Sequence, residues 1–470
     1  MSDIAIAPAG ADYPLLRRGY RWRLLALLLA TNTLSFVDRA IMSVTVEPMR
    51  RDLGLSDAQI GVLQGLAFAA IYALIGLPVG RLAERRNRLW IIAVAIIVFS
   101  AATGLCGFAT SFAQLFFLRM AVGVGEGGFM APATSLVADH YRPDRRASAL
   151  AVILCGTPCG FLIGSIVGGQ IAQHWGWRAA FFAMSVPGIV IAGLLLALLR
   201  EPPRGLAEGA ERRGVEAPPS FGAVLRHLFA QPAFRHLLAG AVLCTCGANA
   251  IGQFQVSFFA RAHHLPLGTA AATSGLISFF SLAPGMLIGG NLVDRVQRRD
   301  ERWYLWTPAI GAAIGAVLFA CGFWQARFGL AVPLILAGGV FLFFHYAPCY
   351  ALVQLIAGVR RRASAVAIYG VFLGLLGSGL GPTIAGLVSS AIARARFTAG
   401  DIASLCPGGR GAEMGGAIDR ACQAASADGI RGAMLAATLF MLWGALHFLL
   451  GARSLRPALA AGRVPLPEAL

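Results

Sequence analysis

The sequence is poor in charge and contains no lysine: only 13% of its 470 residues are charged, and all 39 basic residues are arginine. An ordinary soluble domain has about twice that share of charged residues. Apolar residues make up 57% of the chain, with a mean hydropathy of +0.70, and they gather in helix-length runs between short charged stretches. A soluble core would not absorb so many runs of this length. The pattern therefore predicts a membrane protein that crosses the bilayer many times.

The chain also lacks the motifs of several enzyme classes. No phosphate-binding loop is present, which excludes a primary pump, and no nucleophile motif or His/Cys/Asp cluster with metal-ligand spacing is found. The pair His263–His264 is isolated in a short loop. We therefore expect neither an enzyme nor a bound metal, and no cofactor.

Twelve segments are long and apolar enough to cross a membrane. With a cytoplasmic N-terminus, 27 arginines fall in cytoplasmic segments and 9 in the opposite loops. This bias predicts a bacterial inner-membrane protein with both termini in the cytoplasm, its basic N-terminus leading into a retained first helix. The net charge of +17 is then mainly a topology signal with membrane lipid as a lesser partner, not a nucleic-acid surface. We expect a monomer. The segments are 22–46, 59–80, 89–108, 112–137, 146–171, 179–199, 237–259, 269–292, 303–323, 330–356, 364–392 and 431–450.

A linker and an internal repeat divide the chain into two halves. We predict an N-terminal six-helix bundle at 1–199, a Pro- and Gly-rich cytoplasmic linker at 200–236, and a C-terminal six-helix bundle at 237–470 with a long periplasmic loop at 393–430. RRASALAV at 145–152 recurs as RRASAVAI at 361–368, and GRLAERRNR at 80–88 recurs as GNLVDRVQR at 290–298. The two offsets, 216 and 210, nearly agree. The pattern predicts two parallel repeats related by an axis along the membrane normal.

These motifs resemble those of the major facilitator superfamily, whose fold is all-α with twelve transmembrane helices in two pseudo-symmetric bundles. The resemblance rests on the motif at 80–88, after the second segment, and on WGWRAAFF at 175–182. Within that superfamily the sequence is similar to the Spinster-like branch, through SFVDR at 35–39, RMAVGVGEGG at 119–128 and DHYRPDRRASAL at 139–150. The resemblance implies alternating-access transport of lipid-like cargo.

Four charges lie inside apolar segments. Arg119 and Glu126 are seven residues apart, so they project from one face of a helix, about 10 Å apart, with Gly123 leaving room between them. Asp38 and Arg39 lie in the first segment at a similar depth. One interpretation is a structural network that pairs Asp38 with Arg119 and Arg39 with Glu126.

The alternative is a central transport site, because ionisable groups inside a membrane more often line a pathway than serve packing alone. Glu126 is then the principal proton carrier and Asp38 the second, with the proton as the coupling ion. A freed Arg119 binds an anionic head group. The resemblance implies the same four residues. The predicted substrate-binding set on the first and fourth segments is Arg119, Arg39, Asn32 and Ser35.

The second half supplies a more apolar and aromatic wall. Its candidate substrate-binding residues are Asn249, Gln253, His345, Tyr346 and Tyr350, although each is also consistent with an interhelical hydrogen bond. A cavity that is charged on one wall and aromatic on the other suits an amphipathic substrate.

The repeated turns predict two latches on the cytoplasmic side. Because acids are stabilised at helix N-termini, we expect Glu84 to meet the helix that begins near Arg361, and Asp294 to meet the helix that begins near Arg145. Both contacts would break when that side opens. The other predicted gating residues are Gly80, Arg85, Arg88 and Arg295.

Two further patterns concern structure. Cys406 and Cys422 share the long outer loop, where an oxidising periplasm would permit a disulfide bond, while the other seven cysteines read as small apolar packing residues. Gly156, Gly160, Gly164 and Gly168 form a stripe that lets another helix approach closely.

The sequence thus favours a proton-coupled secondary transporter for an amphipathic, anionic or lipid-like small molecule. The alternative is an efflux or uptake carrier for small organic anions or hydrophobic drugs, with the charged cluster acting as a structural and gating network.

Overall fold

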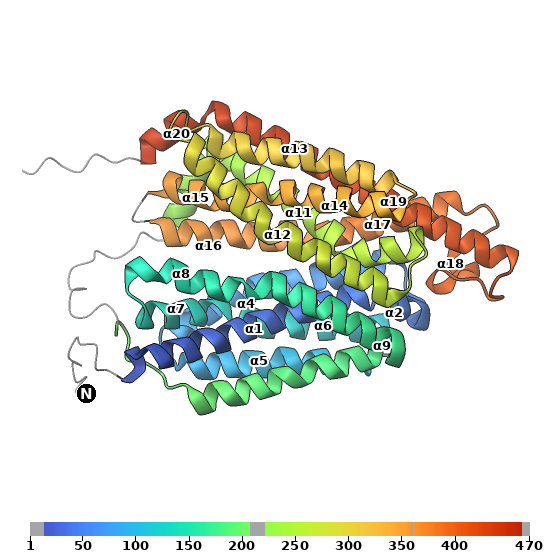
Figure 1. Cartoon of the computed structure of the whole chain (residues 1–470), viewed down its shortest axis with the longest axis horizontal. Helices are drawn as coiled ribbons and strands as arrows, with labels where there is room; N and C mark the ends of the chain where they lie inside the picture. The colour runs from blue at the N-terminus through green and yellow to red at the C-terminus, as the bar shows by residue number, and fades with distance from the viewer. Residues whose placement is uncertain (1–13, 207–220, 359–360, 463–470) are drawn as a thin grey trace, which may run out of the picture.

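The computed structural model describes residues 14–206, 221–358 and 361–462, and every regular element in these ranges is a helix. Two helical halves lie side by side along the long axis of the molecule (Figure 1). The N half (residues 14–206) contains α1 (Arg18–Val44), α2 (Val46–Leu53), α3 (Asp57–Gln64), α4 (Leu66–Ala83), α5 (Arg88–Cys106), α6 (Phe112–Gly127), α7 (Met130–His140), α8 (Pro143–Leu154) and α9 (Gly156–Leu198).

The C half (residues 221–462) is built from the remaining helices. Its main elements are α10 (Phe221–Ala230), α11 (Pro232–Ala262), α12 (Leu267–Val296), α13 (Trp303–Trp324), α14 (Phe328–Leu342), α15 (Tyr346–Ala357), α16 (Arg362–Phe372), α17 (Gly379–Arg396), α18 (Ile402–Leu405), α19 (Ala417–Arg453) and α20 (Leu455–Gly462). A short π-helical segment, Leu373–Ser378, joins α16 to α17.

These helices make twelve membrane crossings. In the described ranges, ten helices or joined helices are long and apolar enough to span a membrane, and one of them, Ser148–Leu198, has 51 residues. A straight helix of that length would measure about 77 Å, more than twice the roughly 30 Å of a bilayer core. Gly176 bends it with a φ of 85°, so this segment makes two crossings. The twelfth is α6 continued by α7, which carries the two charges of the fourth predicted segment.

The predicted glycine stripe lies against α1. A Cβ at Gly160 would stand 2.4 Å from the Thr33 carbonyl oxygen, and one at Gly164 would stand 2.9 Å from that of Val37. The backbones of α9 and α1 are therefore in direct contact over this length. The contact matters because α1 carries Asp38 and Arg39 five and six residues beyond Thr33.

Substitution of Gly160 by alanine should displace α1 and impair the protein. We expect a loss of about 1–3 kcal/mol in stability, because the added methyl group has no space to enter. Gly193→Ala is the matched control, since nothing lies within 4 Å of a Cβ at that position on the same helix. Thermal unfolding of the two purified variants checks this, and equal melting temperatures would show that the close packing is unimportant.

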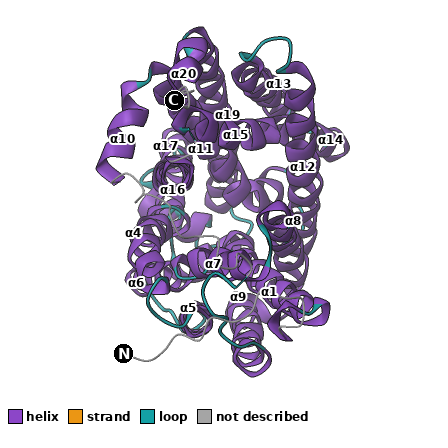
Figure 2. Cartoon of the chain, turned by 90° about the vertical axis from the view of Figure 1, so that its left-hand side faces the viewer, coloured by secondary structure: helices purple, strands orange, loops and turns teal. Residues whose placement is uncertain are grey.

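The two ends of the molecule differ, and we name them by their covalent features. The linker end carries the passage from residue 206 to residue 221, and the disulfide end carries the bond between Cys406 and Cys422. Figure 2 looks onto the linker end, where α10 lies at the rim of the C half beside α16.

Two segment boundaries differ from the sequence interpretation. Residues 221–236 of the predicted linker are helical, forming α10 and the start of α11, while residues 207–220 lie outside the described ranges. The predicted loop at 393–430 is shorter, because α19 begins at Ala417 and continues without a break to Arg453. The first turns of this helix are rich in charged and small residues, and a polar sequence of this kind is also typical of a loop.

Candidate functional site

Two ion pairs join α1 to α6 inside the N half. The Arg119 Nη1 atom lies 2.9 Å from Asp38 Oδ2, and the Arg39 Nη2 atom lies 2.7 Å from Glu126 Oε2. This is the pairing that the sequence suggested. Pairing is expected because an isolated charge in apolar surroundings costs several kcal/mol.

The pair Asp38–Arg119 is sealed from solvent. The two side chains are only 4% and 2% exposed. The hydroxyl of Thr103, on α5, donates a second hydrogen bond to Asp38, and the Phe68 ring centre lies 5.4 Å from the Arg119 guanidinium carbon. A head group would have to displace these neighbours before it could reach Arg119. In this conformation Arg119 is therefore closed to a substrate, and its role in substrate binding stays a prediction for another conformation.

The pair Arg39–Glu126 is only partly covered. The Arg39 side chain is 23% exposed, and its guanidinium carbon lies 4.7–5.3 Å from the ring centres of Phe36, Phe68 and Tyr72. Glu126 is buried, and its Oε1 atom has no hydrogen-bond partner among the described residues. A cation held over aromatic faces remains able to bind an anion. Arg39, and not Arg119, is thus the accessible cation of the cluster.

Glycines on α6 serve helix packing here. A Cβ at Gly123 would stand 2.8 Å from the Phe68 carbonyl oxygen, and one at Gly127 would stand 2.9 Å from that of Tyr72. The room that Gly123 was expected to leave is therefore filled by α4. This close approach brings Phe68 and Tyr72 against the charged cluster.

A tyrosine row on the C half faces the accessible pair. The rings of Tyr346 and Tyr350 are 5.3 Å apart, and Tyr350 meets Tyr369 at 5.0 Å. Tyr346 lies within electrostatic range of both Arg39 and Tyr72, so the row borders the charged wall of the N half. Tyr346 and Tyr350 are both partly exposed. The structure thus brings together the charged and the aromatic wall that the sequence placed on opposite halves.

The remaining polar candidates serve packing in this structure. Asn32 is buried and donates to the Ile153 carbonyl oxygen at 2.9 Å, and Ser35 donates to Thr31 of its own helix. His345 is buried with its Nδ1 atom 2.7 Å from the Leu342 carbonyl oxygen. These three were predicted to bind substrate; here their hydrogen bonds go to backbone carbonyls, and substrate binding by them stays a prediction. Short polar side chains on a helix satisfy nearby carbonyls more readily than a distant ligand.

Asn249 and Gln253 lie on α11 near the plane between the halves. Asn249 is partly exposed and donates to the Thr245 carbonyl oxygen one turn earlier. The backbone oxygen of Gln253 accepts from Ser43 at 2.9 Å and from Gln64 at 3.3 Å, both in the N half. Gln253 therefore joins the halves through its backbone, while its side-chain oxygen is buried and unpaired.

Replacement of Arg119 and replacement of Arg39 should have different effects on stability and on binding. Arg119→Gln leaves Asp38 buried without its counter-ion, so we expect a loss of about 3–5 kcal/mol in stability. Arg39→Gln also leaves a buried carboxylate, Glu126, without its counter-ion, but protonation of Glu126 at this partly open site relieves part of the cost. We therefore expect a smaller loss of stability than for Arg119→Gln and, in addition, weaker binding of an anionic substrate. Thermal unfolding and ligand titration of the two variants separate these effects. Equal destabilisation by both would contradict the distinction between a sealed and an accessible pair.

The predicted latches at the linker end are not engaged. Glu84 and Asp294 are both exposed, and among the described residues Glu84 has no hydrogen bond or ion pair while Asp294 accepts one from Gln297 on its own helix. Within the described ranges, no hydrogen bond or ion pair joins Asp294 or Glu84 to the segments that begin near Arg145 and Arg361. Gly80 packs near Ala131, and Arg85 and Arg295 are exposed. A gating role for these residues stays a prediction for the conformation that is closed at this end.

Arg88 differs from the other predicted gating residues in its contacts. Its side chain is 1% exposed and forms ion pairs with Asp139, on α7, and with Glu201 after α9. It also donates to Ser135 and to the Pro202 carbonyl oxygen. All of these partners belong to the N half. We therefore correct the prediction: Arg88 ties together the linker end of one half and does not bridge the two.

An ion-pair network at the disulfide end joins the two halves, and the sequence interpretation missed it. Arg261, at the end of α11, lies 2.7 Å from Glu47 and 2.7 Å from Asp57 of the N half. Asp57 also accepts from Ser389 on α17 at 2.6 Å, and Arg50 donates to Ser426 on α19 at 3.2 Å. In the sequence, Arg50 and Arg261 count only as arginines of the outer loops, and the other four side chains carry no recognisable signal. We call Glu47, Arg50, Asp57 and Arg261, with the two serines, the interhalf network.

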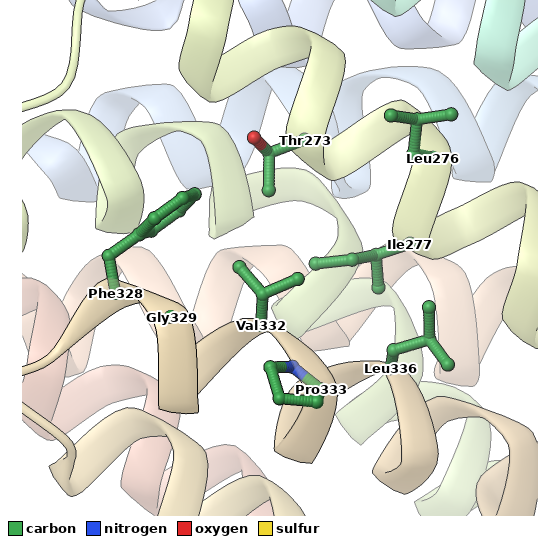
Figure 3. A pocket seen from close by; sticks show the side chains of 8 residues that line it. All are labelled: Thr273, Leu276, Ile277, Phe328, Gly329, Val332, Pro333 and Leu336. Carbon is green, nitrogen blue, oxygen red and sulfur yellow. The ribbon is translucent and has the colours of Figure 1, made fainter.

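A separate apolar groove lies between α12 and α14 (Figure 3). Its volume is about 380 Å³, and Phe328, Val332 and Leu336 on one wall face Leu276 and Ile277 on the other. The lining offers hydrocarbon contacts, with the Thr273 hydroxyl at its edge. Such a groove suits a lipid chain but carries no charge that would select a head group.

Comparison with known proteins agrees with the fold. The Major Facilitator Superfamily profile matches residues 28–382. An "MFS-type efflux pump" of Mycolicibacterium smegmatis is 30% identical over 79% of this chain and 85% of its own length, and "Protein spinster" of Drosophila melanogaster is 25% identical over 79% of this chain and 62% of its own. The crystal structure of a bacterial homologue of the human lysosomal transporter Spinster, inward-facing and unoccupied, superposes with a TM-score of 0.84 at 28% identity, covering 94% of this chain and 99% of that one.

Two helical halves around a charged central cluster define a membrane transporter, not an enzyme, and the chain belongs to the Major Facilitator Superfamily. Within the superfamily it is a Spinster-like protein.

Proposed function

We propose that the protein is a proton-coupled secondary transporter that moves an amphipathic, anionic or lipid-like small molecule by alternating access. The observation that carries the proposal is the pair Arg39–Glu126, in which the accessible cation is held by a buried carboxylate that has one unpaired oxygen. The tyrosine row opposite supplies the apolar wall that such a substrate needs.

Coupling follows from competition for one guanidinium. The anionic substrate and the carboxylate of Glu126 both bind Arg39, so one must leave for the other to bind. Protonation of Glu126 removes its negative charge and frees Arg39. Proton and anion therefore favour each other's binding, and this positive linkage corresponds to symport. Asp38 and Arg119 hold the helices of this pair in register, with Asp38 as a second proton acceptor.

The arginine distribution supports an orientation with the linker end in the cytoplasm of a bacterium. The resemblance to an inward-facing Spinster homologue supports the same assignment, because the hydrogen bonds and ion pairs described between the halves gather at or toward the disulfide end. In this orientation the site is reached from the cytoplasm, and the interhalf network closes the periplasmic side.

The relative named as an efflux pump supports a second candidate, a carrier for hydrophobic drugs or small organic anions. In that case the charged cluster acts mainly in structure and gating.

Substrate-dependent proton flux in proteoliposomes tests the proposal. A panel of lysophospholipids, sphingoid phosphates, organic anions and cationic drugs is applied while internal pH is followed. We expect proton uptake with an amphipathic anion. Proton release on addition of a cationic drug would favour the second candidate, and the absence of flux with every compound would defeat proton coupling.

A further inference from the structure

A polar cavity at the disulfide end lies between the two halves. Its volume is about 250 Å³, far above the roughly 10–15 Å³ that one water molecule requires. The N half contributes α2, and the C half contributes the end of α11, the Gly408–Gly409 turn and the first part of α19. Because residues of both halves line the cavity, a ligand bound in it could hold the two halves together.

Positive charge dominates the lining. Arg50, Arg51, Arg261 and Arg410 line the cavity together with His264, whereas Glu47 is the one acid in the lining. Two acids lie behind the arginines: Asp57 pairs with Arg50 and Arg261, and Asp419 pairs with Arg410. Four arginines thus face three carboxylates. Arg51 is exposed and has no ion-pair partner among the described residues.

Arg50 is the least satisfied of these side chains. It is 8% exposed, and its buried Nε atom lies 3.2 Å from Asp57 Oδ1 without hydrogen-bond geometry. Burial, followed by repulsion from Arg261, lowers the pKa of Arg50 from its ordinary value. Negative charge is therefore deficient at this position even with Asp57 nearby.

The disulfide-bonded loop builds the outer wall of the cavity. Gly408 and Gly409 have φ values of +62° and +77°, and a Cβ at either would stand 2.6 Å or less from an atom of Arg50. Asp419 accepts from the backbone N–H groups of Gly411 and Gly415 and so fixes the loop that presents Arg410. The wall is thus a built surface, held by a covalent bond and a network of hydrogen bonds.

We propose that this cavity binds a small oxyanion of the phosphate or carboxylate class, held by Arg50 and Arg51 of the N half and by Arg410 of the C half. Guanidinium groups bind such anions with paired N–H donors. Because the ligand contacts both halves, it stabilises the conformation that is closed at the disulfide end. The site is remote from Glu126 and does not depend on the proposed proton coupling.

The experiment uses the full-length protein purified in detergent and titrated with inorganic phosphate at constant ionic strength, with chloride as the balance. We expect a saturable rise in melting temperature. Arg51→Gln and Arg410→Gln should each weaken the apparent affinity about tenfold, as expected for loss of one charge-assisted contact. Arg327→Gln is the matched control, an exposed arginine at the same end outside the cavity.

Arg51→Gln keeps the test decisive, because Arg51 is exposed and its replacement should leave the fold intact even if Arg410→Gln disturbs the loop. A second arm uses dihexanoyl phosphatidic acid: stabilisation by this lipid and not by free phosphate would identify a lipid head group as the source of the anion. A response to the lipid that persists in Arg51→Gln would come from the central site and not from this cavity. The proposal is overturned if neither probe stabilises the protein beyond chloride, or if Arg51→Gln responds as the wild type does.

Discussion

Replacement of Glu126 by glutamine should abolish substrate-driven proton uptake while leaving substrate exchange in the absence of a pH gradient intact. Glutamine has the shape of the protonated carboxyl group but does not exchange a proton. Arg39 then has no carboxylate competitor. The affinity for an anionic substrate should rise about 10- to 100-fold, since a hydrogen bond to a charged group contributes about 1.5–3 kcal/mol.

The pH dependence of binding sharpens this prediction. In the wild type, affinity for the anion should increase as the pH falls, because protonation of Glu126 frees Arg39. The Glu126→Gln variant should bind with high affinity at every pH. Glu413→Gln provides the matched control, because it removes one acidic charge from an exposed position outside the cluster. If Glu126→Gln still drives proton uptake, another group carries the proton, and Asp38 is the next candidate.

Replacement of Asp57 by asparagine should open the disulfide end. Asp57 is 2% exposed and is contacted by Arg261, Arg50 and Ser389. Loss of one partner from a buried ion pair costs about 3–5 kcal/mol. The cost falls mainly on the closed conformation, because separation of the halves exposes Arg261 to water. The ratio of open to closed molecules should therefore rise by about two to three orders of magnitude.

Spin labels on the two halves measure this shift. Noncanonical residues at the exposed positions Ser56 and Ala326 carry the labels, so that the native cysteines remain, and the distance distribution should gain a longer component. Asp52→Asn is the matched control, because Asp52 pairs with Arg178 inside the N half only.

A double substitution tests whether the coupling is specific. Addition of Arg261→Gln to Asp57→Asn removes both charges and leaves Glu47 beside Arg50, so the double variant should open less than the sum of the single effects. Unchanged distances in Asp57→Asn, or simple additivity in the double variant, would show that the interhalf network does not hold this end closed.

The membrane fold was predictable because it depends on local composition. Each crossing needs about 20 apolar residues, and this length can be counted in the sequence. The charges inside α1 and α6 also implied their own partners, because a buried charge is rarely left alone. The pairs Asp38–Arg119 and Arg39–Glu126 were accordingly foreseen.

The long-range contacts were not predictable in the same way. Arg261 lies 204 residues from Asp57 and 214 from Glu47, and the three side chains meet only because the two halves pack at the disulfide end. A polar residue at the end of an apolar run is equally consistent with a topology signal or an ion pair. Likewise, nothing local shows that Arg88 turns inward to Asp139 while Arg85 remains exposed.

The sequence by itself determined a two-half membrane transporter with a four-charge cluster, because hydropathy, arginine bias and internal repeats are properties of short segments. Only the tertiary structure decided which members of that cluster are accessible. Thr103 and Phe68 come from other helices and seal Arg119, whereas the rings around Arg39 leave its guanidinium partly open. Accessibility is a property of what surrounds a side chain in space, so the same two arginines that look equivalent in the sequence receive different roles in the folded protein.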